Sequence, residues 1–362
     1  MIKKIAILTS GGDCAGLNAV LRAVVHRADS LGWEVLGIEN GTAGLLETPH
    51  RVRRLMPADF DHFIMRLGGT VLGTTNSRNP FKFPVPGAAG GAGVVDRSGE
   101  VIAALKDLKV DAVIGIGGDG SFEILSKLAA KGGINFVGIP KTIDNDLMMT
   151  DLSVGFDTAV ALATEALDRL QPTAASHDRV MILEVMGRDA GHIALYAGIA
   201  GGADVILIPE IAYSIEGIAR KIAAVKAQGR NFALVIVSEA VKSPDGEKLQ
   251  VVYHGGEKRY GGIGDALGPM IAQATGSETR VTVLGHVQRG ASPTYNDRLL
   301  AQALGVKAVD MVKAGEFGQM VAWQKMRAVG VPIADAIKQC RTVDVNGEMV
   351  HTARSLGISF GD

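Results

Sequence analysis

Short apolar, β-branched runs alternate with longer segments of helical period along the whole chain. The short runs predict strands at residues 4–9, 34–38, 112–116, 136–139, 180–185, 205–208, 232–238 and 281–284. Apolar positions three and four apart predict helices at residues 16–29, 99–108, 121–131, 157–170, 190–200, 214–228, 263–274 and 295–314. Such alternation is typical of βαβ units with right-handed crossovers. We therefore expect an α/β fold with mostly parallel sheets.

The predicted strands fall into two series, which indicates two domains. A polar, turn-rich stretch at residues 140–151 follows four strands, and a second series begins at Val180. A chain of 362 residues also suits about two domains, at a prior of roughly 150 residues each. We expect two similar three-layer α/β/α domains, residues 1–155 with 290–338 and residues 156–289 with 339–362. Residues 82–93, rich in Pro, Gly and Ala, are expected to form a surface loop.

Composition narrows the class of protein without identifying a function. The chain is 47% hydrophobic but only 5% aromatic, and its net charge of -1 favours neither nucleic acid nor a membrane surface as a partner. The two cysteines, Cys14 and Cys340, are far apart and lack metal-ligand spacing, which indicates a reduced interior. No run approaches the roughly 18 apolar residues of a membrane span, and the first residues do not resemble a signal peptide. We expect a cytoplasmic protein.

Two glycine-rich turns follow strands of the first series, where ligands of open α/β sheets bind. Thr-Ser-Gly-Gly-Asp at 9–13 precedes a helix, and such a turn can bring backbone N–H groups to a phosphate. Gly-Ile-Gly-Gly-Asp-Gly-Ser at 115–121 fits the dinucleotide fingerprint formally, but it does not stand in the first βα turn. We interpret Asp119 as a residue that reaches magnesium on a polyphosphate; a solvated turn aspartate is the alternative.

The fourth strand is followed by Pro-Lys-Thr-Ile-Asp-Asn-Asp at 140–146. Its two carboxylates, Asp144 and Asp146, stand beside Lys141 and Thr142. One carboxylate can accept the proton of an attacking hydroxyl while the other helps to hold a metal ion. The alternative is a turn that caps the next helix.

Arginines and histidines mark the strand ends of the second series. They occur in Ser-His-Asp-Arg at 176–179, Met-Gly-Arg-Asp at 186–189, Thr-Arg at 279–280 and Gly-His-Val-Gln-Arg-Gly at 285–290. Each alone is more often a surface residue, but together they indicate an anionic second substrate, since guanidinium groups bind phosphate in a bidentate manner. The P-loop and protein-kinase motifs are missing from the sequence. Two phosphate sites and a carboxylate pair indicate phosphoryl transfer to a small phosphorylated acceptor.

These motifs, in this order, resemble those of the glycolytic 6-phosphofructokinase family, from Lys3 to about Cys340. The resemblance implies two similar α/β domains with the active site in the cleft between them. It also implies transfer of the γ-phosphoryl group of Mg-ATP to the C1 hydroxyl of fructose 6-phosphate, the committed step of glycolysis. Catalytic roles carry over to Asp144 as general base and to Arg188, Thr142, Arg78 and Gly12 around the transferred group.

The resemblance also implies binding roles for further residues. Donor phosphates are expected near Gly11, Gly12, Arg78, Gly118, Asp119, Gly120, Ser121 and Lys141, and Mg²⁺ at Asp119 and Asp146. The sugar is expected near Thr142, Asp144, Met186, Gly187, Arg188 and Glu239, and its 6-phosphate near His286 and Arg289. Arg179 and Arg280 match a pair that reaches this phosphate from a neighbouring subunit, which implies a homodimer or homotetramer. Of the family's basic effector residues only Arg22 is matched, with His26 at a second position, so inherited allostery is not expected.

Two residues bear on the choice of phosphoryl donor, and they favour different donors. Gly120 leaves room for the α-phosphate and ribose of ATP, where pyrophosphate-dependent relatives usually carry aspartate. Lys141 favours the other donor, because its ammonium group can bind a terminal phosphate of pyrophosphate where many ATP-dependent bacterial members have glycine; a lysine nevertheless adds attraction to either donor. Because exclusion discriminates more strongly than added attraction, we predict ATP, with a pyrophosphate-dependent enzyme as the alternative. More remote alternatives are a non-catalytic sugar-phosphate sensor and a lipid- or NAD-kinase-like enzyme, which would lack the Asp144 constellation.

Overall fold

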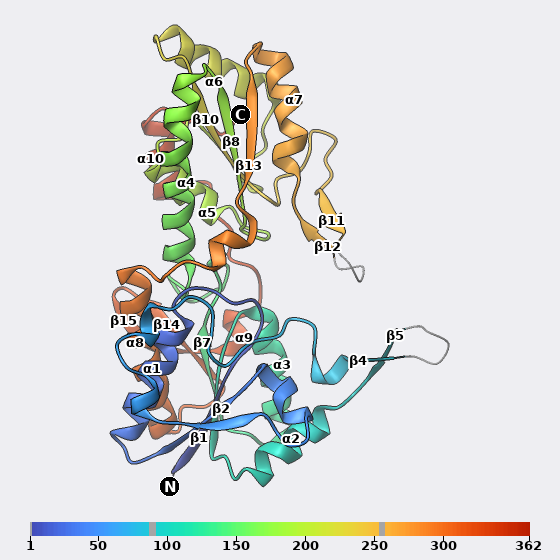
Figure 1. Ribbon diagram of the computed structural model, residues 1–362, viewed down its shortest axis with the longest axis vertical. Coiled ribbons are helices and arrows are strands. Elements are labelled where there is room, and N and C mark those ends of the chain that lie inside the picture. The colour runs from blue at the N-terminus through green and yellow to red at the C-terminus, as the bar shows by residue number, and fades with distance from the viewer. Residues whose placement is uncertain (1, 87–91, 253–257) are drawn as a thin grey trace. The chain divides into compact units, whose positions relative to one another are not determined.

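The computed structural model describes residues 2–86, 92–252 and 258–362 (Figure 1). The chain forms two compact units, which we call unit 1 and unit 2. Unit 1 comprises residues 1–157 and 289–339, and unit 2 comprises residues 158–288 and 340–362. The chain therefore passes between the units three times.

Unit 1 is built on a seven-stranded sheet in the order β15-β14-β7-β6-β1-β2-β3. The strands are β1 (Lys4–Thr9), β2 (Glu34–Ile38), β3 (Val52–Leu55), β6 (Ala112–Gly117), β7 (Phe136–Pro140), β14 (Gln319–Gln324) and β15 (Arg327–Pro332). The five inner strands pair in parallel, whereas β3 and β15 pair antiparallel at the two edges. Buried β-branched and aliphatic side chains on both faces explain why the inner strands read as continuous apolar runs.

Helices cover both faces of this sheet. One face packs against α2 (Ser98–Asp107), α3 (Asp119–Gly132) and α9 (Ile333–Ala336), where Leu8 joins a core cluster with Val101 and Leu125. On the other face α1 (Leu17–Asp29) packs along α8 (Tyr295–Ala314), with Gly305 close to Ala23. Short 3-10 helices occupy Gly41–Leu46 (η1), Pro57–Asp59 (η2), Ile64–Arg66 (η3), Pro80–Lys82 (η4) and Gly285–Arg289 (η6).

Unit 2 is built on a four-stranded parallel sheet in the order β13-β8-β10-β9. Its strands are β8 (Val180–Val185), β9 (Val205–Leu207), β10 (Ala233–Ser238) and β13 (Thr279–Val283). Helices α6 (Ile215–Ala227) and α7 (Ile263–Thr275) pack on one face. Helix α5 (His192–Ala200) packs on the other face against Ile206 and Ile236, next to α4 (Phe156–Ser176) and α10 (Glu348–Ser355) (Figure 1).

The predicted α/β class with mostly parallel sheets is confirmed, and each predicted strand and helix is present. Helix α4 runs six residues beyond its predicted end because it continues through Pro172, which removes one N–H donor without ending the helix. The loop expected at 82–93 is partly wrong: β4 (Phe83–Pro86) and β5 (Ala92–Val95) pair antiparallel there, and residues 87–91 lie outside the described residues. A second small hairpin, β11 (Gln250–Val252) with β12 (Lys258–Tyr260), was not predicted.

None of the helices in the described ranges carries an apolar stretch of the length that crossing a lipid bilayer requires.

Candidate active site

Three neighbouring strands of unit 1 end at the three motifs of the first series. The glycine-rich turn at 10–13 follows β1, the turn at 118–121 follows β6 and the segment at 141–146 follows β7. Because β7, β6 and β1 are adjacent and parallel, their carboxyl ends meet at one edge of the sheet. The sequence placed the motifs at strand ends, and the strand order brings them side by side.

The turn after β1 has one glycine with positive φ and a second that lies against an arginine side chain. Gly11 has φ +82°, a conformation that favours glycine, and its N–H donates to Thr75 O (3.2 Å) while its carbonyl accepts from Thr74 Oγ1 (2.6 Å). A Cβ on Gly12 would lie 2.6 Å from Nη1 of Arg289. The loop at 73–76 and an arginine side chain therefore enclose this turn from two sides.

Lys141 places a buried positive charge behind the turn. Its side chain is 4% exposed, and Nζ donates a hydrogen bond to Gly12 O. Burial lowers the pKa of Lys141, and Arg289 lowers it further, while Cys14 and Asp144 act in the opposite direction. An anion that binds beside this buried ammonium group would stabilise its charged form.

Cys14 takes no part as a nucleophile. Burial raises the pKa of its thiol to about 12, and the thiol donates to Val154 O (3.3 Å).

Thr142, Asp144 and Asp146 form one buried hydrogen-bonded cluster. Thr142 Oγ1 lies 3.1 Å from Asp146 Oδ1 and 3.4 Å from Asp144 Oδ2, and it accepts from Asp144 N (3.1 Å). A hydroxyl has a single proton, so it donates to one of the two carboxylates at a time. Between them Asn145 has φ +52° and is held by Ser153 Oγ at 3.1 Å and by Asp151 O, also at 3.1 Å. The turn thus holds both carboxylates close to one hydroxyl.

The glycine-rich turn at residues 118–121 opens helix α3. Asp119 is its first residue and Gly120 its second, so backbone N–H groups of the first turn are available to an anion. A Cβ added at Gly120 would meet nothing within 4 Å, whereas Ser121 Oγ lies 3.0 Å from the Cβ position of Gly11. Ser121 therefore faces the first turn, and Gly120 borders open space.

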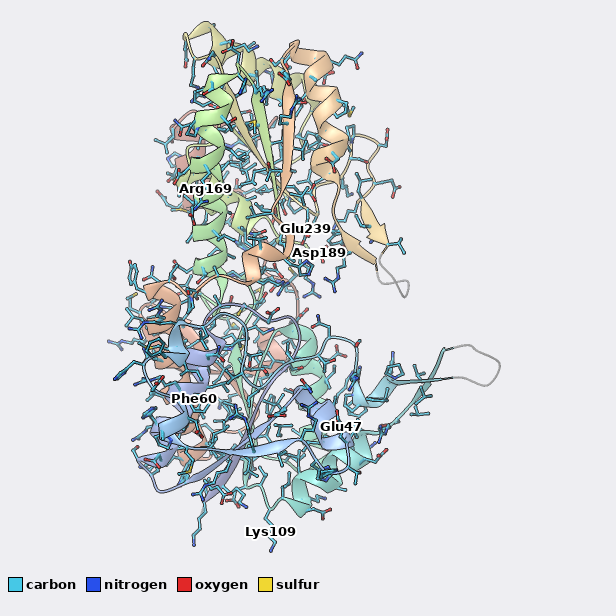
Figure 2. All side chains as sticks on the ribbon, viewed as in Figure 1. Glu47, Phe60, Lys109, Arg169, Asp189 and Glu239 are labelled. Carbon is cyan, nitrogen blue, oxygen red and sulfur yellow. The ribbon has the colours of Figure 1, made fainter. Side chains whose placement is uncertain are left out.

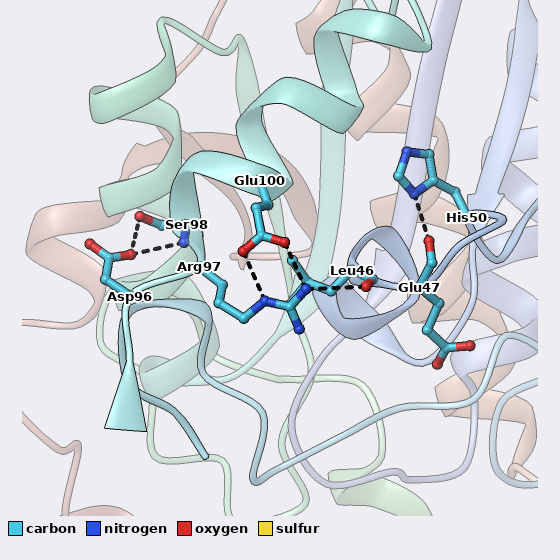
Figure 3. A network of polar contacts seen from close by, with 7 residues as sticks. All are labelled: Leu46, Glu47, His50, Asp96, Arg97, Ser98 and Glu100. Carbon is cyan, nitrogen blue, oxygen red and sulfur yellow. Dashed lines mark hydrogen bonds and ion pairs between the residues drawn. The ribbon is translucent and has the colours of Figure 1, made fainter. Parts of the chain in front are cut away.

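Arg78 pairs with Glu47. Its Nη1 is 3.9 Å from Glu47 Oε1, and both side chains are partly exposed. Figure 3 shows how the end of η1 is fixed: Arg97 Nη2 donates to Leu46 O (3.4 Å), and His50 Nδ1 lies 3.0 Å from Glu47 O. The loop preceding Arg78 contacts Gly11, so Arg78 is close to the turn in the chain, but its side chain is engaged elsewhere.

Arg289 belongs to unit 1, although the sequence analysis grouped it with His286. Its Nη1 donates to Asp13 O (2.8 Å) and lies against Gly12. The chain passes from unit 2 to unit 1 between Gln288 and Arg289, so the two residues predicted to share one phosphate fall in different units.

In unit 2 a carboxylate closes the turn after β8. The N–H groups of Gly187 and Arg188 donate to Glu239 Oε1, at 3.2 and 3.0 Å, and Arg188 has φ +52°. Gln288 Oε1 accepts from Met186 N (2.8 Å). Strands β8 and β10 are neighbours, which brings the end of β10 with Glu239 next to this turn (Figure 2). Gln288 lies in the Gly-His-Val-Gln-Arg-Gly motif, but its role was missed because its partner is a backbone N–H about a hundred residues away in the chain.

A second group of side chains joins this end of unit 2 to the β11–β12 hairpin. His286 Nε2 lies 2.6 Å from Arg259 Nη1, and Asp189 Oδ1 accepts from Lys248 Nζ (2.6 Å) and Tyr260 OH (3.0 Å). Arg259 and Tyr260 were missed because strands of only three residues are too short to show an alternating pattern, and Lys248 was missed because it lies in the loop before β11.

Arg179 and Arg280 meet at the opposite end of the sheet. Both pair with Glu278, Arg179 through Nε at 3.1 Å. They precede or begin the parallel strands β8 and β13, whereas Met186 and His286 follow them. A strand of six residues at roughly 3.3 Å each separates the two ends by about 17 Å. The two arginines are therefore far from Met186 and His286, which we predicted to bind the sugar and its phosphate.

Asp119 and Asp146 fit the ligand chemistry of magnesium. Carboxylates are preferred ligands of this ion, which commonly takes one or two of them together with substrate phosphates. Asp119 and Asp146 follow the neighbouring strands β6 and β7. Within the described ranges no set of three or more His, Cys, Asp or Glu side chains is arranged to hold a metal ion.

Known phosphofructokinases match this chain over most or all of its length. A family model described as "Phosphofructokinase" matches residues 4–312. A protein of Synechocystis sp. named ATP-dependent 6-phosphofructokinase 1 is 57% identical over 362 residues, covering 100% of this chain and 99% of its own. A Nostoc sp. protein of the same name is 56% identical over 360 residues, covering 99% of each. The crystal structure of Pichia pastoris phosphofructokinase in the T-state is 28% identical with a TM-score of 0.80, and the match covers 93% of this chain and 36% of that longer one.

Proposed function

Because this chain belongs to the phosphofructokinase family, we propose that it is an ATP-dependent 6-phosphofructokinase. The reaction is transfer of the γ-phosphoryl group of Mg-ATP to the C1 hydroxyl of fructose 6-phosphate, a step of glycolysis. The observation that carries the proposal is the buried cluster of Thr142, Asp144 and Asp146, next to the enclosed Gly11–Gly12 turn and the lysine behind it. The names of relatives at 47–57% identity favour ATP over pyrophosphate as the donor.

Unit 1 is the proposed donor domain. Gly11, Gly12 and the first turn of α3 would donate backbone N–H groups to the phosphates, with Gly118 and Ser121 alongside. Lys141 adds a positive charge near the transferred group. Open space at Gly120 would admit the α-phosphate and ribose. Asp119 and Asp146 would hold Mg²⁺, which would neutralise charge on the transferring phosphates when it is bound with the nucleotide.

In the proposed step, the C1 oxygen of the sugar attacks the γ-phosphorus and Asp144 accepts the hydroxyl proton. The bond between the γ-phosphorus and the β,γ-bridging oxygen breaks, and its electron pair leaves with ADP. Thr142 Oγ1 can donate to a transferring oxygen or to Asp144, since its proton has a choice of acceptors. Arg188 and Arg78 are proposed to neutralise transition-state charge, which for Arg78 requires it to leave Glu47.

Unit 2 is the proposed sugar domain. Glu239 holds the turn that carries Met186 and Gly187, so we propose that this turn contacts the sugar ring. His286 is proposed to bind the 6-phosphate from unit 2, and Arg289 to bind it from unit 1.

Arg179 and Arg280 are proposed to act on the site of a neighbouring subunit. Their position at the amino ends of β8 and β13, about 17 Å along the strands from the sugar residues, supports this assignment. A homodimer would provide such shared sites, and so would a homotetramer. We also propose a cytoplasmic location, as for an enzyme of central metabolism.

The test is a coupled assay of purified protein with fructose 6-phosphate and Mg-ATP, in which ADP and fructose 1,6-bisphosphate are both measured. The proposal predicts equal amounts of the two products. ADP without sugar bisphosphate would indicate another acceptor, and sugar binding without any product would indicate a sensor instead of an enzyme.

A further inference from the structure

The β11–β12 hairpin is fixed to the sheet of unit 2 at its base. Glu184, a residue of β8 that is 2% exposed, accepts hydrogen bonds from the N–H groups of Gly262 (2.9 Å) and Gly264 (2.7 Å). Burial raises the pKa of Glu184, against the effect of these two donors. Because Gly262 follows β12 by two residues, the buried carboxylate sets where the hairpin leaves the sheet.

Asp189 ties the same hairpin to the proposed sugar-binding turn. Its Oδ1 accepts from Lys248, which precedes β11, and from the hydroxyl of Tyr260, which ends β12. Burial acts to raise the pKa of Asp189, but these two hydrogen bonds keep it below its ordinary value. Asp189 directly follows Arg188, so the hairpin and the turn after β8 keep a fixed relation to each other.

Between these two ties, Arg259 points to His286. Successive side chains of a strand project to opposite sides, so Arg259 lies on the side of β12 away from Tyr260. Its Nη1 is 2.6 Å from His286 Nε2. A guanidinium group only donates hydrogen bonds, so Nε2 accepts here and the imidazole proton is on Nδ1. An arginine and a histidine side by side, each on an anchored segment, can both donate hydrogen bonds to a phosphate: Arg259 through its guanidinium fork and His286 through its ring N–H.

We propose that Arg259 binds the 6-phosphate of the sugar together with His286 and so helps to select phosphorylated sugars. The inference rests on the proposed function, which assigns that phosphate to His286. It adds a binding residue from a hairpin that carries none of the recognised motifs. Asp189, Lys248 and Tyr260 act as positioning residues, because they hold the hairpin and leave Arg259 in reach of His286.

The direct test is calorimetric binding of fructose 6-phosphate to the purified full-length protein without a donor. Arg259→Gln should weaken binding by about 10–100-fold, the usual effect of removing a charge-assisted hydrogen bond. Arg259→Lys should recover part of the affinity, since a lysine keeps the charge but loses the bidentate fork. The matched control is Arg169→Gln, which removes the same charge from unit 2 at an exposed pair with Glu165 (2.5 Å) and should bind as wild type.

Steady-state kinetics separates phosphate binding from a structural role. Arg259→Gln should raise the KM for fructose 6-phosphate by the same factor, with kcat and the KM for ATP unchanged. Fructose lacks the phosphate, so its kcat/KM should be equal in Arg259→Gln and wild type. A merely structural role for the Arg259–His286 contact would instead lower the melting temperature and reduce activity on both sugars.

The outcomes keep the two proposals distinguishable. If wild type binds fructose 6-phosphate and Arg259→Gln binds it equally well, the role of Arg259 is refuted and the proposed function stands. If wild type neither binds this sugar phosphate nor forms product, the proposed function fails, and the inference about Arg259 fails with it.

Discussion

Asp144 is the residue on which the proposed chemistry depends most. It is buried, and its N–H and carboxylate are both held by Thr142. We predict that Asp144→Ser lowers kcat by about 10²–10⁴-fold, the usual contribution of a general base, with a modest change in the KM for fructose 6-phosphate. Asp151→Ser removes an exposed carboxylate from the same loop and should keep kcat within about twofold, as surface substitutions do. A kcat of Asp144→Ser close to that of the Asp151→Ser control would remove the assignment.

Lys141 is predicted to bind the phosphoryl donor and, because it is buried, to lower the free energy of unfolding of the protein. Burial lowers the pKa of Lys141, which means that the folded protein disfavours its charged form. Lys141→Met should therefore raise the free energy of unfolding at pH 7, although it loses the bond to Gly12 O. It should also weaken Mg-ATP binding by about tenfold, as the loss of one charge-assisted hydrogen bond does. The control, Lys127→Met, removes an exposed lysine paired with Glu123.

The difference in free energy of unfolding between Lys141→Met and wild type should change with pH in a direction that the lowered pKa of Lys141 determines. Above the folded-state pKa of Lys141 and below its ordinary value of 10.5, the unfolded chain binds more protons than the folded one. Wild-type stability therefore gains with rising pH in that window relative to Lys141→Met, so the advantage of the variant shrinks. Calorimetric melting temperatures at neutral and alkaline pH test this. An advantage that grows with pH would contradict a lowered pKa.

For single residues, the sequence predicted side-chain chemistry better than side-chain contacts. The motif Pro-Lys-Thr-Ile-Asp-Asn-Asp predicted a carboxylate pair beside a lysine and a threonine. The structure brings the two carboxylates to the Thr142 hydroxyl, while Lys141 donates to Gly12 O. The contact of Arg78 with Glu47 and that of Arg259 with His286 could not be predicted. Both join segments that are far apart in the chain, and local patterns carry no information on such distances.

The first turn of helix α3 decides the phosphoryl donor in our account. Gly120, its second residue, borders open space, and an aspartate there would repel the α-phosphate of ATP. We predict that Gly120→Asp lowers kcat/KM for Mg-ATP by about 10²–10³-fold, because like-charge contacts cost several kcal/mol. Binding of fructose 6-phosphate should be unchanged.

Helix α2 offers a matched control for this change. Gly99 is also the second residue of its helix, and a Cβ there likewise meets nothing within 4 Å. An acidic residue in the first turn suits the helix dipole at both positions, so Gly99→Asp should fold well and keep its ATP activity. Equal loss of ATP activity in both variants would show that Gly120 has no specific role at the nucleotide.

Most inner strands were predictable because their environment is uniform. Strands such as β6 and β10 are buried on both faces and read as unbroken apolar runs. The edge strand β3 was missed because two arginines interrupt its apolar pattern, and β14 and β15, which pair with each other, were missed as well. The order of strands in a sheet is not encoded in local periodicity, so the adjacency of β7, β6 and β1 emerged only from the structure.

At the scale of the whole molecule, the position of Arg280 predicts complementation between subunits. Arg280→Ser and Asp144→Ser should each be inactive alone. A mixed dimer would contain one intact site of two, so random exchange should restore about a quarter of wild-type activity, from the statistics of a two-fold assembly. Mixing Asp144→Ser with Arg188→Ser is the control, because both residues belong to one subunit's site and no hybrid restores it. Failure of the first mixture, with exchange demonstrated, would place Arg280 outside a shared site.

The central claim is that this protein phosphorylates fructose 6-phosphate with ATP. Its most direct test is the ratio of kcat/KM for Mg-ATP to kcat/KM for pyrophosphate with magnesium, measured on the wild-type enzyme at saturating fructose 6-phosphate. The open space at Gly120 and the identity with ATP-dependent relatives predict a ratio well above one. A higher kcat/KM with pyrophosphate would contradict the account.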